Sequence, residues 1–483
     1  MPGKLTYVDL FAGCGGLSLG LEQAGFALEL AVEKSDMAAE TFFHNFIEPI
    51  SDQKEWKSFS APSTPVEEQA KKGVVVKQLS DVLDCKPLLQ DLKSREIDLV
   101  AGGPPCQGFS LAGRRNPEDI RNKLPWEFLE FVEAVSPKAV IIENVSGMSQ
   151  DFKKHNQESP FDQLRQALIQ TGVGYQVQPV HLNAMHFGAP QHRPRVMLLG
   201  LRQDVADATG FKFSDKTWRS EFAKLGSVEF SQKPEIAPIL THFGDDILTV
   251  ADAIADLNDS GYRRVSNLSE FAKEMREGAD WEPAGDAASK RRNKGLPNHT
   301  LRKHAEHIKD RFRLYQFFRD QGVHNKTIAI PKNEDLTTGG KRQLLHEALK
   351  DAKYPAKAPD GKILAHSVEE LIELVLSLGT KKHSQRPLSW TSPSPTVVSL
   401  PDDYVHPDIP RTMTVREMAR FQSFPDNFEF RAKETTGSLR RRVEVPQYTQ
   451  VGNAVPPKMA RAVGLSIRSA LELAAITEGR RAS

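Results

Sequence analysis

The strongest constraint on the fold is an alternation of short apolar runs with helix-length segments over the first 205 residues. The strand-like runs are LTYVDLF (5–11), LELAVE (28–33), VVVKQL (74–79), IDLVAG (97–102), KAVIIE (138–143), YQVQPVHL (175–182) and RVMLLGL (195–201). Strands separated by helices of this length form βαβ units with parallel neighbours. We therefore expect an α/β fold, a doubly wound and mostly parallel sheet with helices on both faces.

The rest of the chain has a different character. Residues 49–73 are rich in Pro, Ser, Lys and Glu and predict a solvated insertion, and from about 205 to 390 the sequence is polar, basic and irregular. Order returns in TMTVREMARFQSF, where Thr414 and Glu417 are spaced as a helix capping box. A final helix is expected to start at Pro456. We predict a domain over 1–205, a second, smaller irregular domain over 206–445, and a C-terminal segment, 446–483, that returns to the first domain.

Composition restricts the class of protein. The 483 residues are 39% hydrophobic and 26% charged, with a net charge of +1, as in soluble globular proteins. No apolar run reaches the length of a membrane span, and the first strand-like run, from Leu5, leaves no room for a signal peptide. Three cysteines without paired spacing argue against a disulfide framework and against a zinc site or other metal centre. We expect free thiols at Cys14, Cys85 and Cys106, and a reducing, cytoplasmic location.

A glycine-rich turn follows the first predicted strand in DLFAGCGGLSLG. Gly13, Gly15 and Gly16 open a helix, which lets a ligand approach the backbone. Glu33, at the end of the second strand, is placed to bind ribose hydroxyls. The spacing departs from GxGxxG, which favours a nucleoside ligand without phosphates, although a tight turn with nothing bound is equally compatible. Asp81, after the third strand, suits either an adenine amino group or a helix cap.

Three further features follow later strands. Cys106 lies in AGGPPCQGFS after the fourth strand, where Pro104 and Pro105 stiffen the turn. A single cysteine is more often a small buried hydrophobe than a nucleophile, but its polar flanks argue against burial. Glu143 begins ENV after the fifth strand, and a glutamate there is often merely solvated. Entering the last strand, QHRPR places Gln191, Arg193 and Arg195 at period two on one face, as an exposed rim or a site for an oxygen-rich substrate.

Taken together, these motifs resemble the DNA (cytosine-5-)-methyltransferases of the bacterial modification type. The resemblance rests on an ordered series over about 5–202 and 393–475: FAGCGG, Glu33, PPCQGFS, ENV, QHRPR, a variable region, RTMTVREMARFQSFPD and QVGNAVPP. It implies a Rossmann-like methyltransferase sheet and an enzyme that methylates carbon 5 of a flipped-out cytosine in duplex DNA. Each motif alone is weak, but the series is specific.

The resemblance assigns catalytic roles. The Cys106 thiolate is expected to add to carbon 6 of cytosine, which makes carbon 5 nucleophilic. Glu143 is expected to meet ring nitrogen 3, a role that calls for a raised carboxyl pKa. Arg195, supported by Arg193 and Gln191, is expected to orient the base and stabilise its carbonyl oxygen.

The resemblance also assigns a cofactor, S-adenosyl-L-methionine. Its expected contacts are Phe11, Gly13, Gly15, Gly16, Glu33, Asp81, Pro105 and Asn453. The family often has an aromatic residue after the ribose-binding acid, whereas this chain has Lys34. That departure places the adenine contacts in question more than the chemistry.

DNA contacts are expected from two regions. The segment after Cys106 resembles the family's loop that closes over DNA and supplies Gly113, Arg114, Arg115 and Arg121. Between residues 290 and 319 lie ten Lys and Arg, including Arg291, Arg292 and Lys294, against two acids. Such a run suits a phosphate-binding stripe within a target-recognition region, although a charge run is usually a solvated face. The segment KKHSQRPLSW (381–390) is a further candidate to face DNA.

Other readings differ in testable ways. A nicotinamide-dependent oxidoreductase would share the glycine turn and Glu33 but not PPCQ, ENV and QHRPR together. An RNA cytosine methyltransferase would have a shorter middle region than the roughly 190 residues here. A non-enzymatic DNA-binding relative would lack Cys106 or Glu143. We expect a monomer that acts either with a cognate restriction endonuclease or as an orphan modification enzyme.

Overall fold

The computed structural model describes residues 4–105, 123–149, 159–222, 233–263, 266–285, 295–324, 338–378, 385–437, 440 and 443–482. Within these ranges one eight-stranded sheet has the order β3-β2-β1-β4-β5-β7-β6-β8. Its strands are β1 (Thr6–Leu10), β2 (Ala27–Val32), β3 (Val74–Val75), β4 (Leu99–Gly102), β5 (Ala139–Val145), β6 (Tyr175–Asn183), β7 (Pro194–Arg202) and β8 (Trp218–Arg219).

The direction of the strands confirms the predicted mostly parallel sheet. Neighbours from β3 through β5 are parallel. Strand β7 lies antiparallel between β5 and β6, and β8 runs parallel to β6. Because β7 is reversed, its first residues lie at the edge where β1, β2, β4 and β5 end.

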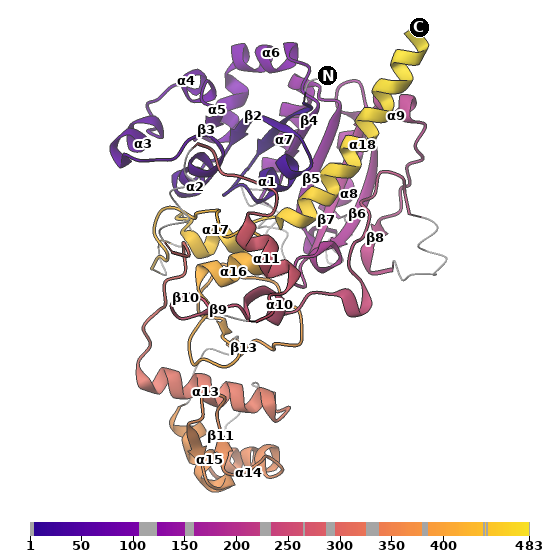
Figure 1. Ribbon diagram of the computed structural model, residues 1–483. Coiled ribbons are helices and arrows are strands. Elements are labelled where there is room, and N and C mark those ends of the chain that lie inside the picture. Colours follow the sequence, from indigo (N-terminus) through magenta and orange to yellow (C-terminus); the bar gives the residue numbers. More distant parts are fainter. Residues whose placement is uncertain are drawn as a thin grey trace.

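Helices cover both faces of the sheet (Figure 1). One face packs against α1 (Gly16–Gln23), α9 (Gln203–Thr209) and α18 (Pro457–Ala482), and the other against α5 (Leu79–Asp84), α6 (Lys86–Ser94), α7 (Leu124–Val135) and α8 (Pro160–Gln170). Strand alternation divides the side chains, so that Tyr7 joins the first core and Val8 the second. Helix α18 confirms the predicted final helix.

The insertion over 49–73 is more ordered than its composition predicted. After α2 (Asp36–Phe46), the chain forms α3 (Gln53–Phe59) and α4 (Val66–Ala70). Trp56 is 5% exposed, with its ring 5.5 Å from that of Phe43. Most residues of the segment are exposed, in agreement with the predicted solvated insertion, and Trp56 anchors it to α2.

The large sheet also extends past residue 205. Strand β8 pairs with β6, and Ile236, Ala237 and Leu240 pack in the core beneath α18. The remaining elements are α10 (Val250–Ile254), β9 (Leu257–Asn258), β10 (Gly261–Tyr262), α11 (Glu270–Glu277), α13 (Glu306–Asp320), α14 (Thr338–Leu349), β11 (Ala356–Lys357), β12 (Ile363–Ala365), α15 (Val368–Ser377), β13 (Arg386–Pro387), β14 (Tyr404–Val405), α16 (Val415–Phe421) and α17 (Gln447–Asn453).

Part of the middle region is a helical unit with its own core. Helices α13, α14 and α15 gather at the end of the molecule farthest from α6 (Figure 1). Phe312, Phe318, Leu371 and Val375 are buried in one cluster there. The prediction of irregular structure is wrong for these residues, since their apolar positions recur at helical spacing within a polar background.

Two local predictions are confirmed. Thr414 caps α16 in a capping box with Glu417, and Cys14 and Cys85 are free and buried. In the part of the chain that the structure describes, no helix is long and apolar enough to cross a membrane.

Candidate active site

Predicted site residues from five segments meet along one edge of the sheet. Strands β2, β1 and β4 end there, followed respectively by Glu33, the glycine turn and Pro104, and Glu143 lies in the last part of the adjacent β5. Arg195 reaches the same edge from the start of β7, opposite Val145. The carboxyl edge of a parallel sheet is where α/β proteins bind ligands.

The glycine turn and Glu33 are held together by backbone hydrogen bonds. Gly13 N donates to Glu33 Oε2 at 2.9 Å, and Ser35 N donates to Oε1 at 2.6 Å. Burial raises the pKa of Glu33, partly offset by these donors. Phe11 has a φ of 60°, a sparsely populated conformation for a side chain of its size. The carboxylate is thus fixed beside the turn, with lone pairs left to accept from further donors.

The three glycines have different surroundings. A Cβ at Gly13, whose φ is +57°, would meet nothing within 4 Å, so the backbone borders open space. A Cβ at Gly15 would lie 2.3 Å from Phe46, and one at Gly16 would lie 2.3 Å from the Val455 carbonyl oxygen. Gly16 is therefore required for the C-terminal segment to dock on α1.

Asn453 and Asp81 lie at opposite ends of this arrangement. Asn453 ends α17 and is exposed, two residues before the Val455 carbonyl that packs on Gly16. Asp81 is exposed, and its Oδ2 accepts from Gln78 N at 3.0 Å in the capping box of α5. Asp81 therefore acts as a helix cap here, and its contact with adenine stays a prediction.

Glu143 and Arg195 form a buried ion pair. Arg195 Nε donates to Glu143 Oε1 at 2.8 Å, and each residue is 9% exposed. Burial raises the pKa of Glu143, while the positive charges of Arg195 and Arg193 oppose that rise. The site thus contains a carboxyl group that holds a proton more readily than an ordinary glutamate.

The turn after β4 approaches this pair. Asn144 Nδ2 donates to the Pro104 carbonyl oxygen at 2.8 Å. A Cβ on Gly103 would lie 2.8 Å from Glu143 Oε2, so glycine permits the close approach. Pro105, the last residue described before the gap, is exposed. Cys106, Arg114, Arg115, Arg121, Arg291, Arg292 and Lys294 lie outside the described residues.

Gln191 and Arg193 are directed at other segments of the chain. Arg193 is 1% exposed and donates to the carbonyl oxygens of Val397 (3.1 Å), Gly452 (2.8 Å) and Ala454 (2.9 Å). Gln191 is fully buried, accepts from Val397 N at 2.6 Å, and donates to the Phe421 carbonyl oxygen at 3.1 Å. Gln191, Arg193 and Arg195 of QHRPR are all buried, so the alternative of an exposed rim is wrong. The described donors of Arg193 contact backbone carbonyl oxygens, and Gln191 also donates to Gln422 Oε1 at 2.9 Å. Their support of Arg195 stays a prediction.

One buried carboxylate was not singled out from the sequence. Asp9, in β1, is 1% exposed and accepts from Ser18 Oγ at 2.6 Å across the glycine turn. Burial raises its pKa to about 7. An acidic residue inside the apolar run LTYVDLF is the signal that could have identified it. The Asp9–Ser18 contact ties β1 to α1 and so helps shape the turn.

Several described members of the basic run between 290 and 319 have partners within the chain. Arg302 pairs with Asp402 (2.7 Å), Lys309 with Glu306 (2.8 Å) and Arg313 with Asp360 (2.7 Å). Arg319 donates to the carbonyl oxygens of Leu388 and Pro407. These four described cations are therefore engaged by different neighbours, and a phosphate-binding role for the run stays a prediction.

Comparison of the sequence with known proteins identifies its family. The profile of the family described as C-5 cytosine-specific DNA methylase matches residues 5–469. The chain belongs to this family. It is accordingly a DNA (cytosine-5-)-methyltransferase.

Individual relatives of the methyltransferase cover nearly its full length. Type II methyltransferase M.AgeI of Thalassovita gelatinovora is 30% identical over 96% of this chain and 99% of the relative. Type II methyltransferase M.DdeI of Desulfomicrobium norvegicum is 28% identical over 95% and 87%. A crystal structure described as a prophage-encoded DNA modification methyltransferase of E. coli aligns with a TM-score of 0.57 at 22% identity, over 97% and 99% of the two chains, which supports the fold.

Proposed function

We propose that this methyltransferase transfers a methyl group from S-adenosyl-L-methionine to carbon 5 of a cytosine flipped out of a specific duplex DNA sequence. The observation that carries this proposal is the buried Arg195–Glu143 pair beside the turn that leads into Cys106. A flipped base is required because a thiol cannot reach carbon 6 inside a stacked duplex.

The chemistry divides among residues of the chain. The Cys106 thiolate adds to carbon 6 of cytosine, carbon 5 then takes the methyl group, and loss of the carbon-5 proton expels the thiolate. Glu143 holds a proton at ring nitrogen 3 while charge develops on the ring. Arg195, fixed by Glu143, donates to the base carbonyl oxygen. Gln191 and Arg193 act as positioning residues, since their donors hold the segments around Val397 and Gly452 against β7.

The glycine turn fits the proposed cofactor. When bound, S-adenosyl-L-methionine supplies the methyl group. Glu33 is placed to accept from ribose hydroxyls, and the open backbone at Gly13 admits close approach of the ligand. Phe11 and Asn453 are assigned to the same ligand by resemblance. Adenine contacts remain assigned to Asp81 by resemblance alone.

Proposals for target recognition, partners and oligomeric state rest on the family to which the chain belongs. Residues between the QHRPR and RTMTVREMARFQSFPD motifs are proposed to recognise the target sequence. The residues proposed to contact DNA phosphates are Arg114, Arg115, Arg121, Arg291, Arg292 and Lys294. The named relatives are type II methyltransferases, which favours pairing with a restriction endonuclease. We propose that the enzyme acts as a monomer.

Bisulfite sequencing of host DNA with and without this protein tests the proposal directly. The expected result is new 5-methylcytosine within one recognition sequence. Absence of new 5-methylcytosine in cells that contain soluble protein would contradict the proposed function.

Replacing Cys106 with serine is expected to abolish methyl transfer while leaving DNA binding largely intact, because the hydroxyl is a far weaker nucleophile than a thiolate. Transfer of labelled methyl groups to plasmid DNA and a gel-shift titration measure the two properties. A serine variant that still methylates the plasmid would exclude the covalent mechanism.

Replacing Gly13 with alanine is expected to weaken S-adenosyl-L-methionine binding by about 10- to 200-fold, because one added carbon enters the proposed cofactor space. Gly172→Ala is a matched control: it also has a φ of +57° and open space around the Cβ, and it precedes β6 at the opposite edge of the sheet. Both variants bear similar backbone strain of about 1–2 kcal/mol. Equal affinity of the two variants in calorimetric titration would argue against this cofactor position.

A further inference from the structure

The middle region contains a cavity of about 260 Å³ where α13 begins. Its lining includes two arginines, Arg302 and Arg311, the carboxylate of Asp402, and the apolar side chains of Ile308 and Phe312. Donors, an acceptor and an apolar wall converge in one recess. Such a mixture is typical of sites that recognise a particular polar outline.

The lining side chains are held in place by the protein. Arg311 Nε donates to the Leu378 carbonyl oxygen at 2.9 Å, which fixes the plane of its guanidinium. Arg302 donates to Asp402 Oδ1 at 2.7 Å, and Gln385 Nε2 donates to the Asp402 carbonyl oxygen at 2.9 Å. The recess is therefore preorganised.

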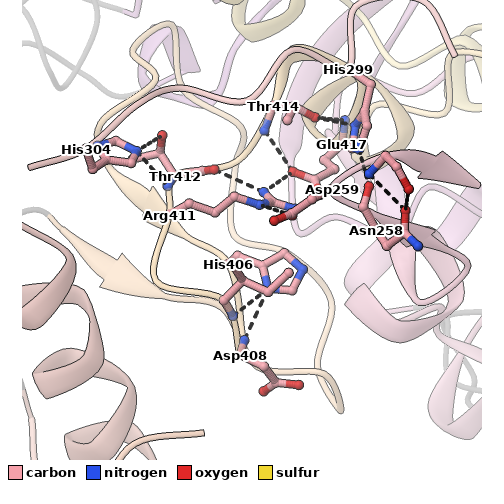
Figure 2. Close-up of polar contacts among 12 residues, drawn as sticks. Asn258, Asp259, His299, His304, His406, Asp408, Arg411, Thr412, Thr414 and Glu417 are labelled. Atoms are coloured by element: carbon pink, nitrogen blue, oxygen red, sulfur yellow. Dashed lines mark hydrogen bonds and ion pairs between the residues drawn. The ribbon is translucent and has the colours of Figure 1, made fainter. Parts of the chain in front are cut away.

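A buried polar network lies behind one wall of the recess. Thr412 N and Oγ1 lie 3.4 and 3.3 Å from His304 Nε2, next to the bidentate Arg411–Glu417 pair at 2.9 and 2.7 Å (Figure 2). Because a backbone N–H can only donate, Nε2 of His304 acts as the acceptor. Burial also lowers the pKa of His304. The imidazole is therefore neutral, and the fixed charges of the recess are those of Arg302, Arg311 and Asp402.

The recess is connected to the active edge by a short segment. Val397 is held by Gln191 and Arg193, and Asp402 lies five residues later. Five extended residues span at most about 18 Å, which corresponds to about five base pairs at roughly 3.4 Å each. Asp402, in the lining of the recess, is thus at most about 18 Å along the chain from Val397, which is held by Gln191 and Arg193 where the chain enters β7.

We propose that this recess reads a G·C base pair of the recognition sequence. Arg311 donates to guanine O6 and N7, and Asp402, oriented by Arg302, accepts from the cytosine amino group. A phosphate is a poorer match, since Asp402 repels an anion and apolar side chains complete the wall. The inference rests on the proposed function and names residues that determine its sequence specificity.

Two substitutions of Arg311 test the proposal. R311K keeps the charge but loses the planar pair of donors, whereas R311Q loses both. Methylation rates are measured on duplexes that carry every single-base change in the recognition sequence established for the wild-type enzyme. At one G·C position, discrimination should fall by about 5- to 150-fold in both variants, while preferences at other positions stay within about twofold.

The control is K350Q, which removes one cation from an exposed position directly after α14, outside the recess, where Lys350 pairs with Glu347. Its discrimination should equal that of the wild type. Unchanged preferences in both Arg311 variants would overturn the proposal. A second pattern would also overturn it: R311Q binds all the duplexes more weakly by the same factor and with a reduced salt dependence, while R311K binds and discriminates as the wild type does. That pattern indicates a phosphate contact.

Two further observations distinguish failure of this proposal from misfolding of a variant and from failure of the proposed function. Lysine keeps a donor for the Leu378 carbonyl oxygen, so R311K keeps the test decisive if R311Q does not fold. If the wild-type enzyme forms no 5-methylcytosine, the proposed function fails before any specificity is compared. If it methylates and both variants keep its specificity, only the assignment of the recess fails.

Discussion

Replacing Glu143 with glutamine is expected to lower the rate of methyl transfer by about 10²- to 10⁴-fold. The change keeps the shape of the side chain but replaces the ionisable carboxyl group that accepts from Arg195 Nε at 2.8 Å with an amide that cannot exchange a proton with the base. Single-turnover rates with saturating DNA measure the effect. Glu130→Gln, an exposed position on α7, is the matched control and should retain the wild-type rate.

The same group predicts a pH dependence. Burial raises the pKa of Glu143, so its protonated form persists to higher pH than in an ordinary glutamate. If that proton supports catalysis, the wild-type rate falls as pH rises through this pKa, and Glu143→Gln lacks that fall. A glutamine variant with the wild-type rate and pH profile would rule out this role.

Replacing Arg193 with methionine is expected to lower the free energy of unfolding by about 3–5 kcal/mol. The substitution leaves the carbonyl oxygens of Val397, Gly452 and Ala454 without their guanidinium donor in a buried environment. The midpoint of denaturant unfolding measures the loss. Arg440→Met, at a side chain that is 77% exposed, should change it little.

A second readout separates positioning from general stability. Arg193→Lys keeps the charge but satisfies fewer carbonyls, so its kcat should fall at temperatures where it remains fully folded. An Arg193→Met variant as stable as the Arg440→Met control would show that the contacts around Val397 contribute little. That result would also weaken the assignment of Arg193 as a positioning residue.

Much of the catalytic half could be predicted from local patterns. Short apolar runs separated by helix-length segments identified strands β1 to β7 of the large sheet, and capping chemistry identified α16 from Thr414 and Glu417. Parallel strands bring their carboxyl ends to one edge, so Glu33, the glycine turn and Glu143 could be placed together before the structure. Arg195 lies with them because β7 runs antiparallel to β5, and the periodicity of the sequence does not predict that direction.

The errors arose where long-range contacts decide the outcome. Arg193 and Arg195 are indistinguishable by sequence period, yet one holds three carbonyl oxygens and the other pairs with Glu143. In the basic run around α13, the described cations pair with acids distant in sequence, such as Asp402 and Asp360. Arg291, Arg292 and Lys294 lie outside the described residues, so their contact with DNA stays a prediction.

The sequence by itself determined the α/β class, the order of the motifs and the family to which the chain belongs. The fold class, the motif order and the family depend on local propensity, on periodicity and on the order of residues within successive strand–turn–helix units. Only the tertiary structure decided which polar groups meet: the Glu143–Arg195 pair, the backbone contacts of Gln191 and Arg193, and the recess at Arg311. Partners separated by tens to hundreds of residues are selected by packing and by the need to satisfy buried charges, which no local pattern records.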